Sequence, residues 1–236
     1  GDWENDPENA SKVVDENGEP LVVYHGTYVE NPFDVFYFDK ADLGFHFGNY
    51  QQAKNRVETK KSILHRKKQS IINPYFLNIK TLFNASDIGE WQYPQRYIDM
   101  IVDENIITED EAKTNGFFTT YYPDDNKAIR DFIINKHGVN VGFVYDNKYE
   151  GDGQSFIVLK ESQIKLADGS NRTFDENNPD IRYAKGGEFD DAKLLKEYNS
   201  NKSIGFSAIA HLKAKGLIPR SDGKIRKSEK YMEKGG

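Results

Sequence analysis

The chain has 236 residues, 37% of them hydrophobic and 13% aromatic, so it can bury a core and is too aromatic to be disordered. It contains no cysteine, which excludes disulfides, thiolate metal sites and a cysteine nucleophile and fits an intracellular protein. The net charge of −6 is uneven, because the residues from Lys202 onward carry +6 and the remainder carries −12. We expect any nucleic-acid contact to come from this basic tail; a solvated tail without a ligand is the alternative.

Targeting and metal signals are missing from the sequence. No apolar stretch is long enough to span a membrane, so we expect no membrane contact. The N-terminus does not resemble a signal peptide. The five histidines lack the spacing of metal ligands, so we expect no metal site.

The first part of the chain predicts short strands, one helix and a tight turn at Asn17-Gly18. Asn49 is a suitable N-cap for the helix. The expected elements are a hairpin with arms at 12–15 and 21–25, a strand at 44–48, a helix at 49–70 and a strand at 75–79.

The middle of the chain is predicted to be helical, because apolar residues recur there at helical spacing. Two apolar strands follow, joined by a polar loop. The expected elements are helices at 93–105, 108–112 and 124–138 and strands at 139–145 and 155–159. Because strands flank a helical insert and do not alternate regularly with helices, the pattern predicts an α+β fold and not a doubly wound parallel sheet.

The C-terminal part predicts a linker and a small appendage. Residues 167–188 are rich in Pro, Gly and Asn, and the residues after them predict two short helices and a basic run. The polar start and the Gly-Gly end suggest a chain cut from a larger polyprotein. The expected division is a flexible N-terminus at 1–11, a domain at 12–166, a linker at 167–188 and a small helical basic segment at 189–236.

Three predicted strand ends carry polar side chains. In "VVYHGTY", the strand is expected to end at His25, and Gly26 would leave its backbone open to a ligand such as a carboxamide. In "GFHFGNYQQAKN", His46 takes the face opposite the phenylalanines. In "GDGQSFIVL", Gln154 and Ser155 begin an apolar strand. On the first stretch alone, a surface histidine at a strand-to-turn junction is the better interpretation; all three together predict a cleft.

In order and spacing, these stretches resemble the motifs of ADP-ribosyltransferases of the His-Tyr-Glu type, the branch shared by poly(ADP-ribose) polymerases and diphtheria toxin. The resemblance covers residues 10–185 and is strongest to domains of multidomain (polyvalent) phage proteins. It implies a split β-sheet fold, with two packed antiparallel sheets around a cleft, a helical insert and a small basic C-terminal tail. It also implies a cytoplasmic location in a bacterial host, or association with the virion.

The resemblance implies that NAD is the co-substrate. His25 would bind an NAD ribose hydroxyl, Gly26 would hold the nicotinamide carboxamide through its backbone, and His46 would replace the tyrosine that stacks on nicotinamide. The implied catalytic residues are His25, His46, Gln154 and Ser155. The implied NAD-binding residues are Tyr24, His25, Gly26, Thr27, Phe45, His46 and Gln52.

Ser155 stands where the family carries its catalytic glutamate. That carboxylate is worth a few kcal/mol beside a developing positive charge at an effective dielectric of about 20, whereas serine offers only a neutral hydrogen bond. Gln154 could bind a ribose hydroxyl, and Glu150 or Asp152 could supply the charge; a merely solvated loop is the alternative.

We therefore expect a mono-ADP-ribosyltransferase with an unknown macromolecular acceptor, either a protein or a nucleic acid. Ser155 favours one alternative, a catalytically silent module that binds NAD or ADP-ribose. The basic tail favours another, a phage nucleic-acid-binding protein.

Overall fold

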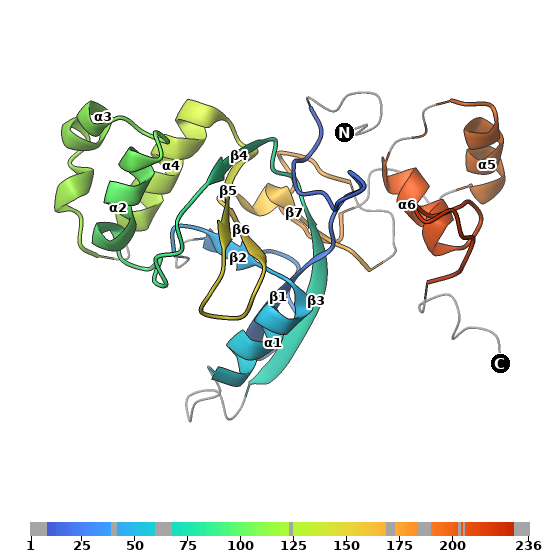
Figure 1. Ribbon diagram of the computed structural model, residues 1–236, viewed down its shortest axis with the longest axis horizontal. Coiled ribbons are helices and arrows are strands. Elements are labelled where there is room, and N and C mark those ends of the chain that lie inside the picture. The colour runs from blue at the N-terminus through green and yellow to red at the C-terminus, as the bar shows by residue number, and fades with distance from the viewer. Residues whose placement is uncertain are drawn as a thin grey trace.

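The computed structural model describes residues 9–38, 42–59, 68–122, 125–168, 173–183, 190–202, 204 and 206–228. Within these residues, two β-sheets and a group of helices form the main body, and two further helices lie at one end of the molecule (Figure 1). The predicted α+β class and the predicted helical insert are both confirmed. No helix in the described ranges has the length and apolar character needed to cross a membrane.

The first sheet is antiparallel and has the strand order β1-β3-β7, with β1 at Val23–Val29, β3 at Gln69–Leu77 and β7 at Ile164–Leu166. The strand expected to end at His25 instead continues for four residues. His25 pairs with Asn73 and Gly26 pairs with Ile72, so the His-Gly pair lies inside the ladder. The predicted hairpin is reduced to a turn, in which Val14 and Pro20 form an isolated bridge.

The second sheet has the order β2-β6-β5-β4, with β2 at Phe45–Phe47, β6 at Gln154–Val158, β5 at Val141–Asp146 and β4 at Thr81–Asn84. β4 and β5 are parallel, so the expectation of purely antiparallel sheets is wrong for this pair. The helical insert lies between the two strands in the chain, and a long crossover of this kind is what a parallel pair requires.

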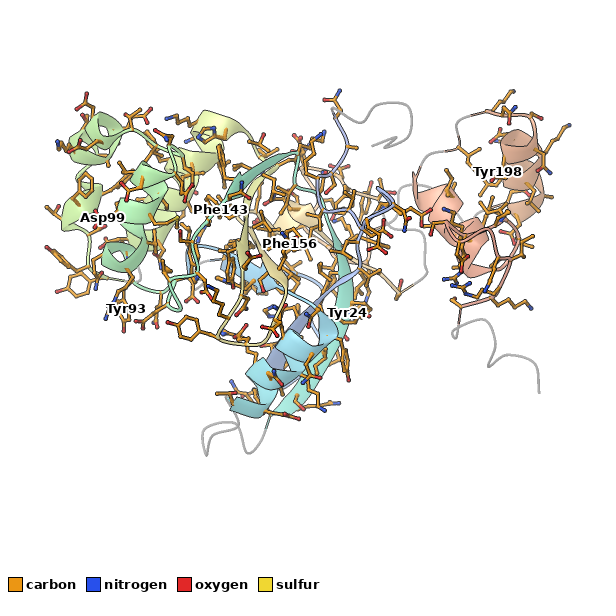
Figure 2. The ribbon with its side chains drawn as sticks, viewed as in Figure 1. Tyr24, Tyr93, Asp99, Phe143, Phe156 and Tyr198 are labelled. Atoms are coloured by element: carbon orange, nitrogen blue, oxygen red, sulfur yellow. The ribbon has the colours of Figure 1, made fainter. Side chains whose placement is uncertain are left out.

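The second sheet separates two hydrophobic cores. On one face, Phe47 and Phe156 pack with Val23 and Tyr75 of the first sheet and form an inter-sheet core. On the other face, Ile157 and its neighbours pack under three helices, α2 (Pro94–Asp103), α3 (Glu109–Thr114) and α4 (Asn126–His137). The alternation of side chains along β6 assigns them to the two cores. Phe143 and Phe156, labelled in Figure 2, belong to different cores.

Helix α1 (Tyr50–Thr59) packs across β1. It is shorter than the expected helix at 49–70; residues 60–67 lie outside the described ranges, and Gln69 already belongs to β3. A Cβ atom on Gly26 would lie 2.3 Å from the carbonyl oxygen of Ala53 and 2.8 Å from a methyl group of Val57. Glycine is therefore needed at position 26 because a helix crosses the strand there.

The ordered body extends into the stretch expected as a linker. Ile181 is buried in the inter-sheet core, and its carbonyl oxygen accepts a hydrogen bond from the Leu166 amide at 2.9 Å. The buried Lys165 ammonium donates to the carbonyl oxygens of Asn178 and Asp180, at 2.9 and 2.7 Å. These contacts hold residues 173–183 against β7. The two expected C-terminal helices are present as α5 (Asp191–Asn199) and α6 (Phe206–Ala214).

Candidate active site

A polar cavity of about 570 Å³ lies beside the face of the second sheet that also packs under the helices. His46 pairs with Ile157, and Tyr145 pairs with Ser155, so His46, Tyr145 and Ser155 share this face. The side chains that matter most for the chemistry of this cavity are His46, Arg56, Trp91, Tyr145, Asn147 and Glu150.

The His46 ring is held between two aromatic side chains. Its Nδ1 lies 3.0 Å from the Tyr145 hydroxyl, and the Trp91 and Tyr145 rings contact it edge to face, with centroids 5.7 and 5.9 Å away. Burial raises the pKa of Tyr145 well above its usual value, so the phenol is neutral and can donate to Nδ1. The ring proton of a neutral His46 then resides on Nε2.

Ser155 is only 2% exposed, and its hydroxyl contacts protein groups. It accepts a hydrogen bond from the Asn147 side-chain amide at 3.0 Å and lies 3.4 Å from the Gln52 amide oxygen. The same Asn147 amide nitrogen is 3.3 Å from the second carboxylate oxygen of Glu150. The Asn147 side-chain amide therefore bridges Ser155 and the Glu150 carboxylate, which lines the cavity.

Glu150 is positioned by an ion pair and by its own backbone. One carboxylate oxygen lies 2.7 Å from an Arg56 guanidinium nitrogen, and both side chains are part-buried, with 25% and 33% of their surface exposed. The Glu150 amide donates to the Asn147 side-chain oxygen at 2.9 Å, and its carbonyl oxygen accepts from Asn55 at 2.7 Å. Arg56 and Asn55 belong to α1, so the helix fixes this carboxylate.

Gln52, predicted to bind NAD, holds the loop between β5 and β6 against α1. Its side-chain nitrogen donates to the carbonyl oxygens of Gly151 and Gly153 at 2.9 and 3.0 Å. Its side-chain oxygen accepts from the backbone N–H of Asn49 at 2.8 Å. Both ends of the side chain are therefore engaged within the protein. The structure gives Gln52 the geometry of a positioning residue.

His25 lies at a second cavity, of about 460 Å³, which Phe45 and Thr27 also line. Its ring packs against Phe36, Phe45 and Phe47, with centroid distances of 5.3 to 5.9 Å. Nδ1 is 2.7 Å from the carbonyl oxygen of His46, which can only accept, so the proton is on Nδ1 and Nε2 is left as an acceptor. Burial lowers the pKa of His25 to about 4, so the ring is neutral at pH 7.

The His25 ring donates a hydrogen bond to the backbone carbonyl oxygen of His46, but the two histidine rings line different cavities. The cavities lie on opposite faces of β2, because His46 lines the first and its strand neighbour Phe45 lines the second. Gln154 follows the alternation of β6, lies on the face opposite Ser155 and is exposed. Of the nine residues predicted from the sequence, the structure therefore places His46 and Ser155 together and His25, Thr27 and Phe45 together.

The backbone of Gly26 faces the edge of β1 opposite β3. Tyr24 exchanges two hydrogen bonds with Gly48, at 2.7 and 3.0 Å, and alternate residues of a strand point the same way. The N–H and C=O of Gly26 are therefore directed toward this edge, on the side where β2 lies. Tyr24 itself contacts Tyr50 edge to face, at 5.5 Å. This orientation of Gly26 is the one that a backbone site for a carboxamide needs.

Sequence reasoning missed Arg56, Asn147 and Tyr145. Arg56 looks like any basic residue of a solvated helix, and Tyr145 looks like a core residue of its strand. Asn147 offered a weak signal, because a polar side chain directly after an apolar strand often faces a ligand site.

Two packed sheets with a His-Gly pair on the strand at their junction, and with a cavity on either side of the neighbouring strand, are consistent with an ADP-ribosyltransferase-like domain. The chain belongs to the family described as ADP-ribosyltransferase in polyvalent proteins, whose model matches residues 15–174. The match leaves the His-Tyr-Glu subtype unassigned and ends before α5. We found no match among curated proteins and none among solved structures.

The buried state of His25 predicts how stability depends on pH. The folded pKa of about 4 lies below the usual 6.5, so the unfolded chain binds the proton more readily between these values. Stability is therefore lost as the pH falls from about 6.5 to about 4. Between pH 7 and 4.5, urea unfolding should show a loss roughly 2 kcal/mol larger for the native chain than for His25→Phe. Equal losses in both proteins would remove His25 as the cause.

Proposed function

We propose that this protein is a mono-ADP-ribosyltransferase, which cleaves NAD at the bond between nicotinamide and ribose and passes ADP-ribose to a macromolecular acceptor. One observation carries the proposal beyond family membership. The carboxylate of Glu150 lines the cavity together with His46, one amide group away from Ser155. The charge that Ser155 lacks is thus present nearby on another residue.

Cleavage of the glycosidic bond gives nicotinamide the bonding electron pair and leaves positive charge on the ribose. A carboxylate beside that ribose stabilises the charge, and a preorganised group of this kind is worth more in a cavity than in water. Arg56 and Asn147 hold the Glu150 carboxylate in place before the reaction. A nucleophile of the acceptor then bonds to the same ribose carbon and loses its proton.

The residues on the sheet junction fit the remaining parts of NAD. His25 Nε2 is an acceptor for a ribose hydroxyl, because Nδ1 is committed to the His46 carbonyl. The Gly26 backbone offers one donor and one acceptor to the carboxamide, and Lys68 at the second cavity offers a positive charge to the diphosphate. We assign the adenosine half to the His25 cavity and the nicotinamide half to the His46 cavity.

A single transfer fits this site better than chain elongation. The family resemblance implies that polymerising members use the glutamate to activate the acceptor hydroxyl, and this chain has Ser155 at that position. Ser155 is also buried beneath Asn147 and Gln52, where it cannot reach an incoming hydroxyl without a rearrangement.

A second candidate function is a catalytically silent NAD-binding module. The Arg56–Glu150 ion pair favours it, because a carboxylate already neutralised by a guanidinium stabilises a second positive charge less well. Two assays separate the candidates: calorimetry with NAD, and nicotinamide release over time. Binding together with release supports the transferase, and binding without release supports the module.

His25→Ala should weaken NAD binding by about 1 kcal/mol, or roughly fivefold in Kd, because it removes one hydrogen bond to a ribose hydroxyl. Calorimetry measures the loss, and circular dichroism shows that the variant is folded. His25→Gln is the matched control. Its side-chain amide can still donate to the His46 carbonyl oxygen, but it does not present an acceptor to the cavity in the way that Nε2 of His25 does. If a folded His25→Ala protein bound NAD with unchanged affinity, His25 would have only a packing role and would not contact the ribose.

A further inference from the structure

The C-terminal unit, residues 190–202, 204 and 206–228, has a small core of its own. Leu194, Leu195 and Tyr198 of α5 pack against Ile209 and Leu212 of α6 and against Ile218. The family match ends at residue 174, so membership in the transferase family does not account for this unit. In Figure 1 it lies at the opposite end of the molecule from α2–α4, and in Figure 2 Tyr198 is correspondingly far from Tyr93 and Asp99.

A turned segment follows α6, and we call residues 217–228 the basic hairpin. The Arg220 amide donates to the Lys224 carbonyl oxygen at 3.0 Å, and the Gly223 amide donates to the Arg220 carbonyl oxygen at 2.8 Å. Gly223 has a φ of +72°, which a tight turn with a left-handed residue requires. The Ser228 amide donates to the Ala214 carbonyl oxygen at 2.8 Å, so the returning arm is fixed to the end of α6.

The basic hairpin presents cations to solvent. Lys224, Arg226 and Lys227 are all exposed, and Ile225 between them is 62% exposed. Arg226 forms an ion pair with Asp222 of the same hairpin, whereas none of the described carboxylates lies within ion-pair distance of Lys224 or Lys227. The chain from Lys202 onward carries +6 while the rest carries −12. Net positive charge is therefore found in the C-terminal part of an otherwise acidic chain.

Other basic residues of the unit serve its structure. Lys215 and His211 each lie 2.6 Å from the carboxylate of Asp191, which joins the two helices. Lys213 forms an ion pair with Glu19, in the turn that precedes β1. The pairs to Asp191 hold the two helices together, and the Lys213–Glu19 pair links the unit to the main domain.

We propose that the C-terminal unit binds duplex DNA, with the basic hairpin in the minor groove. Proteins that bind this groove use Arg and Lys and often insert an apolar side chain such as Ile, which matches Arg226 beside Ile225. Single strands are bound on exposed aromatic platforms, whereas Tyr198, the aromatic side chain described in this unit, packs against the small core. The minor groove of duplex RNA is wide and shallow and would not grip the hairpin.

The binding should show little sequence preference. The minor groove presents a degenerate pattern of donors and acceptors that mainly separates A·T from G·C pairs, so side chains placed there read little sequence. Affinity would come from phosphate contacts, and its logarithm should then fall linearly with the logarithm of the salt concentration. This inference is independent of NAD chemistry.

The test is fluorescence anisotropy of the full chain with a labelled duplex of about 20 base pairs, at about 50 to 200 mM salt. The triple variant Lys224→Gln/Arg226→Gln/Lys227→Gln should bind at least about tenfold more weakly at the low salt concentration, and its salt slope should be smaller by about 2 to 3. The matched control, Lys54→Gln/Lys113→Gln/Lys127→Gln, removes the same charge from exposed helices of the main domain and should bind like the native chain.

A second variant distinguishes the apolar contact of Ile225 with DNA from the ionic contacts of the basic residues. Ile225→Ala should weaken binding without changing the salt slope. The proposal is overturned if the native chain does not bind the duplex at about 50 mM salt. It is equally overturned if the triple variant binds like the control, or if a single strand or an RNA duplex of the same sequence binds as tightly as the DNA duplex.

Discussion

Replacing Glu150 by glutamine should lower the rate of NAD cleavage by about 10²- to 10³-fold, the loss typical when one preorganised electrostatic group is removed from an active site. Glutamine keeps the size of the side chain and can still accept a hydrogen bond from Arg56. What disappears is the negative charge beside the ribose. The measurement is nicotinamide release over time, with NAD affinity determined in parallel to show that binding is retained.

Asp152→Asn is the matched control for this prediction. Asp152 lies two residues further along the same loop, is exposed and does not line the His46 cavity, so its loss should leave the rate unchanged. Ser155→Glu should help little, because a second carboxylate near Glu150 would repel the first. If Glu150→Gln keeps full activity while Ser155→Glu raises it, the missing charge belongs at position 155 and the assignment to Glu150 is wrong.

Gly26→Ala should destabilise the protein by about 2 to 3 kcal/mol, at the upper end of the range for overpacking a tight contact. The added Cβ would lie 2.3 Å from a backbone carbonyl oxygen, that of Ala53, so α1 as a whole has to move. The urea midpoint measures the loss. Because α1 carries Arg56 and Gln52, the displaced helix should also lower NAD cleavage.

Adding Val57→Ala to Gly26→Ala provides the control. It removes the methyl group 2.8 Å from the new Cβ but leaves the Ala53 carbonyl in place, so stability should not be recovered. A Gly26→Ala protein as stable as the native chain would show that α1 does not cross β1 at this point. Gly26 would then serve only its predicted backbone contact with a ligand.

Periodicity along the chain predicted the local elements well. The helices of the insert were found because apolar residues such as Ile129 and Ile133 recur along one helix face. Alternation also placed His46 opposite Phe45 and Phe47, as the structure shows. The end of the first strand was predicted wrongly, because a glycine within a strand was read as a break. The structure shows that a helix packed over Gly26 requires it.

The arrangement of the candidate site could not be read from local patterns. The Arg56–Glu150 ion pair and the Gln52–Gly151 hydrogen bond join residues about a hundred positions apart. The sequence marked Glu150 only as one of two loop carboxylates. Packing of the loop on α1 distinguishes it from Asp152, and the parallel pairing of β4 with β5 likewise depends on the whole insert.

As proposed above, this chain moves ADP-ribose from NAD to a macromolecule. The most direct measurement uses NAD labelled in its adenylate half, incubated with the protein in a bacterial lysate, and follows the label into acid-precipitable material. We predict that the native chain transfers label, that Asp152→Asn does so equally, and that Glu150→Gln does not. Bound NAD that is recovered intact, with no label in the precipitate, would contradict the transferase and leave the NAD-binding module.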